Sequence, residues 1–307
     1  MASRRQMTPQ TPTLEMPVPQ EGAAPRPAES RARRGAGLLR KYRGIPLGGV
    51  LLLGVLALAL FAPWLTNIEP TALNPRGRLT PPGEAHLFGT DNLGRDVFSR
   101  TVWGARLSLQ IGWLVAVLTV LSGTCVGLIA GYFRRLDTPI MRLMDGMMAF
   151  PGILLAIALM AALGPSKFNV VTALTIVYTP RMARVVRSMT LTVRELPFVE
   201  AARAQGMLQH RIILRHILPQ CLSPLIVQGT FIFAEAVLGE ASLSFLGAGT
   251  PPYIPSWGNM LGEARAYLRD APWTMLFPGF TLSSTVLALN LLGDGIRDLL
   301  DPRLRKG

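Results

Sequence analysis

The sequence has little of what metal centres and disulfides need. It contains only two cysteines and three histidines among 307 residues. Cys125 and Cys221 both lie in apolar segments, where a free thiol behaves as a small hydrophobic side chain. His210 and His216 do not have the i, i+4 spacing of a metal pair on one helix. We therefore expect neither a disulfide nor a zinc site.

Motifs of catalysis and nucleotide binding are missing as well. The sequence has no Gly-x4-Gly-Lys-Ser/Thr loop, so it lacks the usual phosphate cradle for ATP. It also has no His-Glu-x-x-His zinc motif and no Gly-x-Ser-x-Gly nucleophile turn. The chain is therefore predicted not to be an enzyme and to hold no metal or cofactor of its own.

Charged residues are scarce, at 16% of the chain, whereas hydrophobic residues make up 50%. Three segments without any Asp, Glu, Lys or Arg exceed the roughly 18 residues that indicate a membrane-spanning helix. They are Ile45–Leu65, Leu107–Phe133 and Ala271–Gly293. The sequence thus predicts an integral membrane protein in contact with lipid.

Basic residues outnumber acidic ones by 31 to 18, which gives a net charge of +13. Such a balance also suits a nucleic-acid-binding protein, because Lys and Arg neutralise phosphates. Here, however, the basic residues cluster beside the ends of apolar runs, as in the cytoplasmic loops of membrane proteins. We therefore expect no nucleic-acid partner and place both termini in the cytoplasm. The clusters are Arg134 and Arg135; Arg184, Arg187 and Arg194; Arg303, Arg305 and Lys306.

Composition divides the chain into three parts. Residues 1–43 are rich in Pro, Glu, Ala and Arg, which predicts a disordered cytoplasmic tail rather than a cleaved signal peptide. Residues 44–106 should hold a first transmembrane helix, a proline-containing extracytoplasmic loop and an amphipathic surface helix over 92–106, for which Asp91 is a candidate cap. Residues 107–307 form the transmembrane core.

Six spans are expected in an all-α membrane protein. The fourth contains three arginines in its continuation, so we expect its helix to run out into the cytoplasm. A short basic loop should cover 131–142 and an outer loop 247–270. The predicted spans are Ile45–Leu65, Leu107–Tyr132, Gly146–Leu163, Phe168–Thr179, Pro219–Leu238 and Trp273–Leu292.

The polar stretch over about 195–219 predicts a short helical hairpin on the cytoplasmic side. Leu196–Gln205 has good helix formers with a small-residue face, and Leu208–His216 can form a second helix. Gly206 between them permits a tight turn, and Pro219 suits the first turn of the next span. Composition alone favours an ordinary basic loop between spans, because inner loops of membrane proteins are generally positive.

This stretch resembles the EAA coupling loop of ABC importer permeases, whose form is E-A-A, three residues, G, nine residues, I-x-L-P. His216 holds the place of the Ile, and the Leu-Pro ending is kept. The resemblance implies that the loop sits in a groove of an ATPase subunit and transmits its closure. The ATPase-coupling residues implied in this way are Glu200, Ala201, Ala202, Gly206, Leu218 and Pro219.

Three further stretches resemble a narrower family, the second permease of dipeptide, oligopeptide and nickel importers. They are FGTDNLGRDVFSR at 88–100, EASLSFLG at 240–247, and NLLGDGIRD at 290–298 running into LDPR at 300–303. The resemblance covers roughly Leu87 to the end of the chain. It implies the type I ABC importer permease fold with six transmembrane helices and a cytoplasmic coupling hairpin.

The same resemblance implies the surroundings of the chain. A homologous second permease, two ATP-binding cassette ATPases that hold ATP and Mg, and an extracytoplasmic solute-binding protein would complete the importer in the bacterial inner membrane. Di- or oligopeptides are the expected cargo, with a nickel chelate or glutathione as alternatives. An intramembrane enzyme or a passive anchor is the alternative from another class, and it leaves the 200–219 pattern unexplained.

Several roles stay open at this level. The 88–100 stretch suits either a helix cap with an interface anchor or a docking element for an external binding protein. A carboxylate at membrane depth usually faces a cavity or a partner, so Glu235 is a candidate for the pathway or an interface. Glu240 suits either that role or a place at the outer membrane interface. Arg297 is expected to oppose Asp294 and Asp298 in a cytoplasmic anchor.

Overall fold

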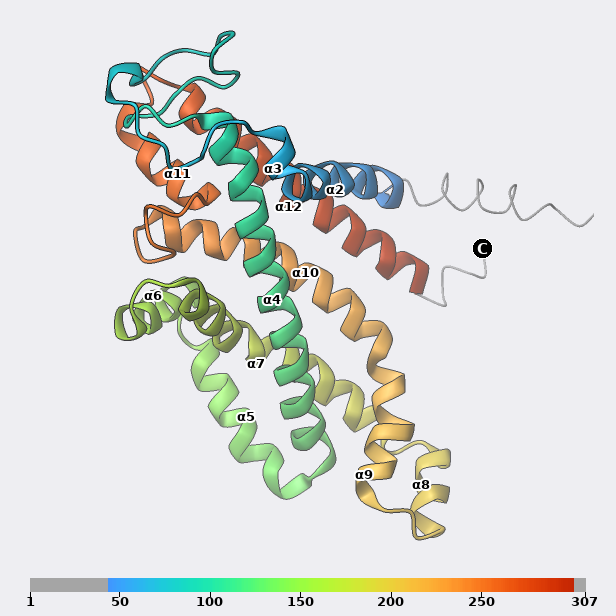
Figure 1. Ribbon diagram of the computed structural model, residues 1–307. Helices are drawn as coiled ribbons and strands as arrows, with labels where there is room; N and C mark the ends of the chain where they lie inside the picture. Colours follow the sequence, from blue (N-terminus) through green and yellow to red (C-terminus); the bar gives the residue numbers. More distant parts are fainter. Residues whose placement is uncertain (1–43, 301–307) are drawn as a thin grey trace, which may run out of the picture. The chain divides into compact units, whose positions relative to one another are not determined.

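The computed structural model describes residues 44–300, and these are helical apart from loops and one isolated antiparallel bridge (Figure 1). The predicted tail at 1–43 and the basic end at 301–307 lie outside the described residues. The helices are α2 (Gly44–Leu60), α3 (Ala62–Leu65), α4 (Val97–Tyr132), α5 (Arg134–Met148), α6 (Gly152–Leu163), α7 (Lys167–Val193), α8 (Pro197–Ala204), α9 (Gln209–Ile212), α10 (Leu218–Phe245), α11 (Trp257–Ala264) and α12 (Trp273–Leu300). Short turns are η1 (Pro75–Gly77), η2 (Ile213–Ile217) and η3 (Arg265–Tyr267).

Three described helices are long and apolar enough to cross a membrane: α4, the continuous stretch Gln209–Phe245 that contains α10, and α12. The pair α5 and α6 makes a fourth if it counts as one span, although the two are bent by 92°. The other two expected spans correspond to α2, which has 17 residues, and α7, which carries three arginines. The all-helical class is confirmed, with three to four spans by length and composition.

Prolines interrupt two of the expected spans. The first span divides at Phe61 into α2 and α3, because Pro63 has no N–H to continue the hydrogen-bond ladder. The third divides between Met148 and Gly152, where Pro151 disfavours helical geometry at the preceding residue. The expected basic loop at 131–142 is wrong, since only Phe133 separates α4 from α5.

The expected surface helix at 92–106 is not a separate element. Residues 97–132 form one helix, and Val97, Val102 and Ala105 in its first turns are buried rather than laid on a membrane surface. The helix cap is Asp96, whose carboxylate accepts a hydrogen bond from the Ser99 amide at 2.7 Å. The sequence had suggested Asp91 as the cap, but Asp91 does not cap this helix. It is part of a charge cluster instead.

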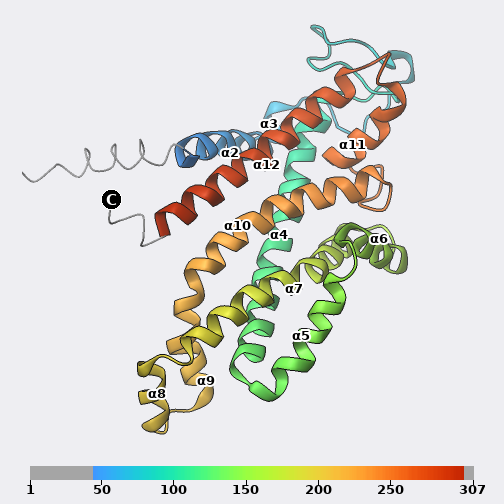
Figure 2. The same cartoon turned by 180° about the vertical axis from the view of Figure 1, so that it is seen from behind.

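The expected outer loop at 247–270 is folded. It contains α11, whose Trp257 is fully buried and donates a hydrogen bond from its indole to the Thr101 carbonyl at 3.0 Å. Gly258 lets α11 approach α10, since a Cβ there would lie 2.4 Å from the Ala241 carbonyl oxygen. The segment thus packs against α4 and α10 (Figure 2).

Helix α4 is the centre of the packing, and its closest neighbour is α7. Glycines at positions 123, 127 and 131 of α4 face α7, and a Cβ at any of them would lie within 2.6 Å of an α7 atom. At Gly127 the obstructing atom is the Ala183 carbonyl oxygen, which is backbone and cannot turn away. Small residues at every fourth position let two membrane helices approach closely and gain van der Waals contact. This stripe fixes the α4–α7 pair.

We expect Gly127→Leu to destabilise the protein by about 1–3 kcal/mol or more, because the new side chain overlaps the α7 backbone. Thermal unfolding in detergent, followed by monodispersity on size exclusion, measures the effect. Gly146→Leu is the matched control, since nothing lies within 4 Å of a Cβ at that α5 position. Equal melting temperatures for the two variants would contradict the packing role of the stripe.

Candidate functional site

The 195–219 stretch forms a helical hairpin attached to the ends of α7 and α10. In α8, which starts with Pro197 at its first position, Val199 and Ala202 are buried in the cluster that contains Val186 and Ile217. Glu200 and the other residues between these two positions are exposed. The helix therefore has one face in the protein and one face free.

The hairpin turns at a residue that has to be glycine. Gly206 has a φ of 74°, in the left-handed region where a Cβ is unfavourable. Its amide donates to the Arg203 carbonyl at 2.9 Å, and the Met207 amide donates to the Ala202 carbonyl at 3.1 Å. These two bonds make a Schellman motif, which satisfies the last carbonyls of α8. The turn is thus held by the backbone.

After the turn, α9 runs through a π-helical turn into α10. The Leu218 amide donates to the carbonyl of Ile213, five residues earlier. The wider turn puts Ile212 and Ile217 on the same side, and both are buried with Cys221. The second predicted helix therefore exists, but it continues directly into the membrane-facing helix, so that any movement of the hairpin is a movement of α10.

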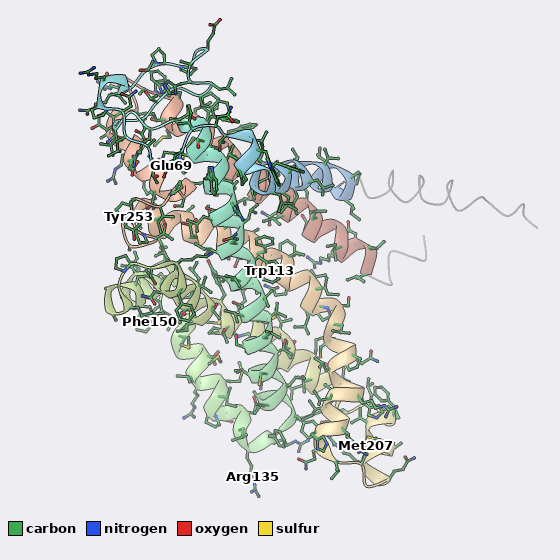
Figure 3. All side chains as sticks on the ribbon, viewed as in Figure 1. Glu69, Trp113, Arg135, Phe150, Met207 and Tyr253 are labelled. Carbon is green, nitrogen blue, oxygen red and sulfur yellow. The ribbon has the colours of Figure 1, made fainter. Side chains whose placement is uncertain are left out.

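Two arginines tie the hairpin to α4. The Arg203 guanidinium lies 5.3 Å from the centroid of the Tyr132 ring, a cation–π distance. Arg194 donates to the Gly131 carbonyl at 2.6 Å, at the last turn of the same helix. Figure 3 marks this region by Met207. The hairpin is therefore joined to α4, α7 and α10 and is not a loose loop.

The predicted coupling residues do not share one surface. Glu200, Ala201, Gly206 and Pro219 are exposed, Leu218 is half-buried, and Ala202 is buried inside the hairpin. Exposed apolar side chains accompany them. Leu208 is 58% exposed just after the turn, and the sequence reading had placed it only as the start of a helix. The sequence feature that could have identified Leu208 is its position as a large apolar residue between a turn glycine and a polar run.

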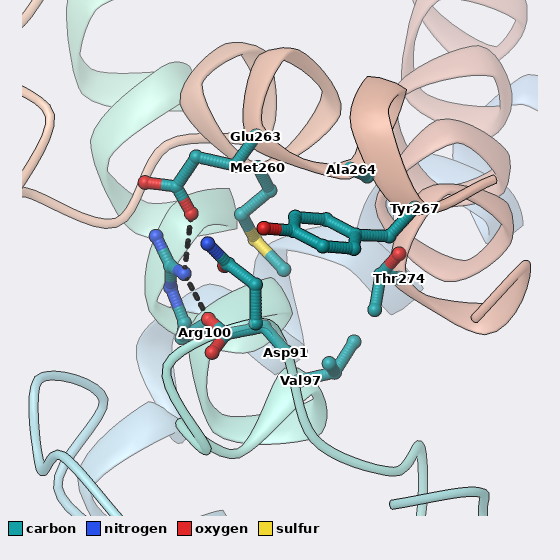
Figure 4. Close-up of a pocket in the computed structure, with 9 residues that line it drawn as sticks. Asp91, Val97, Arg100, Met260, Glu263, Ala264, Tyr267 and Thr274 are labelled. Atoms are coloured by element: carbon teal, nitrogen blue, oxygen red, sulfur yellow. Dashed lines mark hydrogen bonds and ion pairs between the residues drawn. The ribbon is translucent and has the colours of Figure 1, made fainter. Parts of the chain in front are cut away.

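At the other end of the described structure, the 88–100 stretch contributes to a buried charge cluster (Figure 4). Arg95 binds Asp91 at 2.7 Å and Glu263 at 2.5 Å, and Arg100 contacts both carboxylates, Glu263 at 2.8 Å. The Arg100 side chain is only 2% exposed. The two positive and two negative charges therefore balance in the interior. Glu263 comes from α11, which the sequence reading had taken as loop.

Of the two carboxylates singled out in the fifth predicted span, Glu240 is fully buried. It accepts hydrogen bonds from Ser108 on α4 and Ser244 on its own helix, both at 2.9 Å. It lies inside the subunit and reaches neither a groove nor an outer surface in the structure. Through the hydrogen bond to Ser108, Glu240 joins α4 to α10.

Glu235 differs, since 38% of its side chain is exposed, and its carboxylate accepts a hydrogen bond from Arg181 on α7. Two further ion pairs follow along α7, both to α5. Arg184 binds Asp145 at 2.7 Å, and Arg187 binds Asp137 at 2.7 Å through its second nitrogen. The sequence showed these arginines as basic residues of one helix but could not show their partners.

Arg297 makes none of the ion pairs found within 44–300, so the expected pairing with Asp294 and Asp298 is wrong.

Residues 123–306 match the protein family described as the inner membrane component of binding-protein-dependent transport systems, and the chain belongs to this family. The chain is similar to a putative peptide transport system permease protein of Brucella abortus, with 54% identity over 267 residues, 87% of this chain and 90% of that protein. It is also similar to a dipeptide transport system permease protein of Alkalihalophilus pseudofirmus, with 47% identity over 87% of this chain and 88% of that protein.

A solved structure of an amino acid ABC transporter with histidines overlays 67% of this chain and 94% of that chain at a TM-score of 0.48 and 17% identity. The family membership defines a multi-pass permease component of the inner membrane.

We expect Gly206→Ala to cost about 1–2 kcal/mol of stability, because a Cβ is unfavourable at a left-handed φ. Gly146→Ala, at an open helical position, should be neutral or slightly stabilising. Thermal unfolding of the purified protein in detergent compares the two. Opposite signs for the two alanine substitutions support the turn geometry, and a neutral Gly206→Ala contradicts it.

Asp91→Ala should cost about 3–5 kcal/mol, since it leaves two buried arginines with one carboxylate. Glu69→Ala, in the same segment between α3 and α4, removes an exposed carboxylate and should change stability by less than about 0.5 kcal/mol. Yield and melting temperature of each variant in detergent provide the measurement. A small effect of Asp91→Ala would show that the cluster is not what holds this end of the protein together.

Proposed function

We propose that this chain forms one half of the translocation pathway of an ATP-driven, binding-protein-dependent importer of di- and oligopeptides. The relatives named above as peptide and dipeptide permeases cover almost nine-tenths of the chain, which supports this cargo. The observation that carries the transport role is the rigid hairpin with an exposed Glu200 face inside the segment that matches the family.

The proposed topology has six crossings with both termini in the cytoplasm. In this topology α2 and α7 add to the three helices that length and composition indicate as spans, and the bent pair α5 and α6 counts as one more. Arginines at the ends of α4 and α7, beside the hairpin, support a cytoplasmic hairpin. In this proposal residues 1–43 are a cytoplasmic tail, 44–106 hold the first span and the extracytoplasmic segment, and 107–307 are the permease core.

The proposed partners are a homologous second permease, two ATPases that supply the ATP and Mg sites, and an extracytoplasmic binding protein. The hairpin would insert its free face, with Glu200, Ala201 and Leu208, into an ATPase. Because Val199 and Ile217 are buried under it, the hairpin cannot move without the core. Closure of the ATPases would thus tilt α7 and α10 and alternate access across the membrane.

Glu200→Arg tests this coupling. In the complex purified with its neighbouring permease and ATPase subunits in lipid, binding protein with mixed peptides should stimulate ATP hydrolysis by the wild type. The substitution should remove at least about 90% of that stimulation, because it reverses a charge on the contact face. Steady-state phosphate release measures both.

Asp298→Arg is the control, since it makes the same charge change at another exposed position, near the end of α12 and outside the hairpin. If both variants lose stimulation equally, the contact is not specific to the α8 face. If no ATPase purifies with the chain, the importer role fails. If hydrolysis responds to a nickel chelate or glutathione and ignores peptides, only the cargo fails.

A further inference from the structure

The ion pair of Arg181 and Glu235 lies in the middle of two long helices. At 1.5 Å per residue, Arg181 is about 21 Å from the start of α7 and about 18 Å from its end. Glu235 is about 25 Å from the start of α10 and about 15 Å from its end. In the proposed topology both helices cross the bilayer and the pair lies deep within it, so the fourth span extends past Thr179, where the sequence had ended it.

Neither charge is hidden inside the subunit. The side chains of Arg181 and Glu235 are 52% and 38% exposed, unlike Glu240 five residues further on. Charges at this depth face a cavity or a partner and not lipid, because hydrocarbon cannot solvate them. The face of the subunit that carries this pair is therefore turned away from the lipid.

A groove adjoins the pair. It has a volume of about 440 Å³ and runs between α6, α7 and α10, with Glu235 at its edge. Its walls are mostly apolar, from residues such as Ile153, Leu174 and Leu238. Tyr178 donates its hydroxyl to the Glu235 carbonyl at 3.1 Å, and Ser242 donates to the Leu238 carbonyl at 2.8 Å. Among the residues that line the groove, Glu235 is the one with a carboxylate, and this carboxylate accepts from Arg181.

We propose that Arg181 and Glu235 form a site for the terminal charges of a peptide on its way through the pathway. The Glu235 carboxylate accepts from the peptide ammonium group, and the Arg181 guanidinium donates to the peptide carboxylate. Between transport events the two side chains neutralise each other. This inference rests on the proposed function, since it takes the cargo to be a zwitterionic peptide.

The exposure of the pair suits such an exchange. A solvated ion pair is worth little, so a peptide can replace each partner without a large loss. The apolar walls of the groove contact side chains of any kind and add no sequence preference. A site of this kind holds the two charged termini that all dipeptides share and releases them easily, as a pathway requires.

Charge removal tests the site in proteoliposomes that contain the whole complex and saturating binding protein. We expect Glu235→Gln and Arg181→Gln each to lower uptake of alanyl-alanine at least about tenfold, because each substitution removes one charge-assisted hydrogen bond to the peptide. Peptide-stimulated ATP hydrolysis should stay within about twofold of wild type, because the hairpin is untouched. Arg184→Gln, one turn further along α7, is the matched control and should retain uptake within about twofold.

The accessibility of the groove to a water-soluble thiol reagent provides a measurement that does not depend on transport. In a chain with Cys125→Ser and Cys221→Ala, Ser242→Cys places a thiol in the groove and Leu287→Cys places one on the exposed face of α12. A membrane-impermeant methanethiosulfonate should modify position 242 at least about tenfold faster, since the reagent reaches only groups in contact with water. Alanyl-alanine with binding protein should slow that reaction.

The outcomes separate this inference from the proposed function. Uptake by the wild type together with normal uptake by Glu235→Gln, or an unreactive position 242, overturns the site alone. Equal loss of uptake, ATP hydrolysis and thermal stability in both variants also overturns it, since the pair would then only hold α7 to α10. No uptake of alanyl-alanine by the wild type overturns the peptide cargo, and the site with it.

Discussion

The close contact of α4 with α7 over three glycines is the constraint on which the rest of the structure depends. Lipid tails are as apolar as the helices, so membrane helices gain little by hiding apolar surface and associate through close packing. Gly123, Gly127 and Gly131 bring the α7 backbone against α4. This contact sets the position of α7, and with it the positions of Arg181, Arg184 and Arg187.

Once α7 is fixed, several charged and polar groups of the bundle meet their partners. Each of the three α7 arginines reaches a carboxylate on α5 or α10, and the Ser108 hydroxyl reaches Glu240. At one end, Asp91 and Glu263 balance two arginines, and Glu263 lies more than 160 residues after both of them in the sequence. The helices are therefore joined by paired charges and hydrogen bonds at several levels, while their outer faces stay apolar.

The hairpin is firmly attached to the long helices because it has no soft joint. A Schellman turn at Gly206 closes α8, a π-turn leads without a break into α10, and Val199 lies in the same cluster as Ile217 and Cys221. Arg203 on Tyr132 adds a third attachment, to α4. A partner bound to the exposed face of α8, as proposed above, would thus act on three long helices at once.

The sequence by itself determined the all-helical membrane class, the approximate course of most spans, the hairpin with its turn at Gly206, and the family. These depend on local properties: the length of apolar runs, the freedom of glycine, and a short motif at fixed spacing. It misjudged local breaks where one residue decides, such as Pro63 and Pro151, and it assigned the α4 cap to Asp91 in place of Asp96.

Only the tertiary structure decided which residues meet. Glu235 and Glu240 look alike in sequence, yet one is exposed beside a groove and the other is buried among serines, because they point to different sides of one helix. The partners of the α7 arginines and the role of Glu263 are distant in the chain. Pairing between helices depends on their rotation and depth, and no local pattern encodes these quantities.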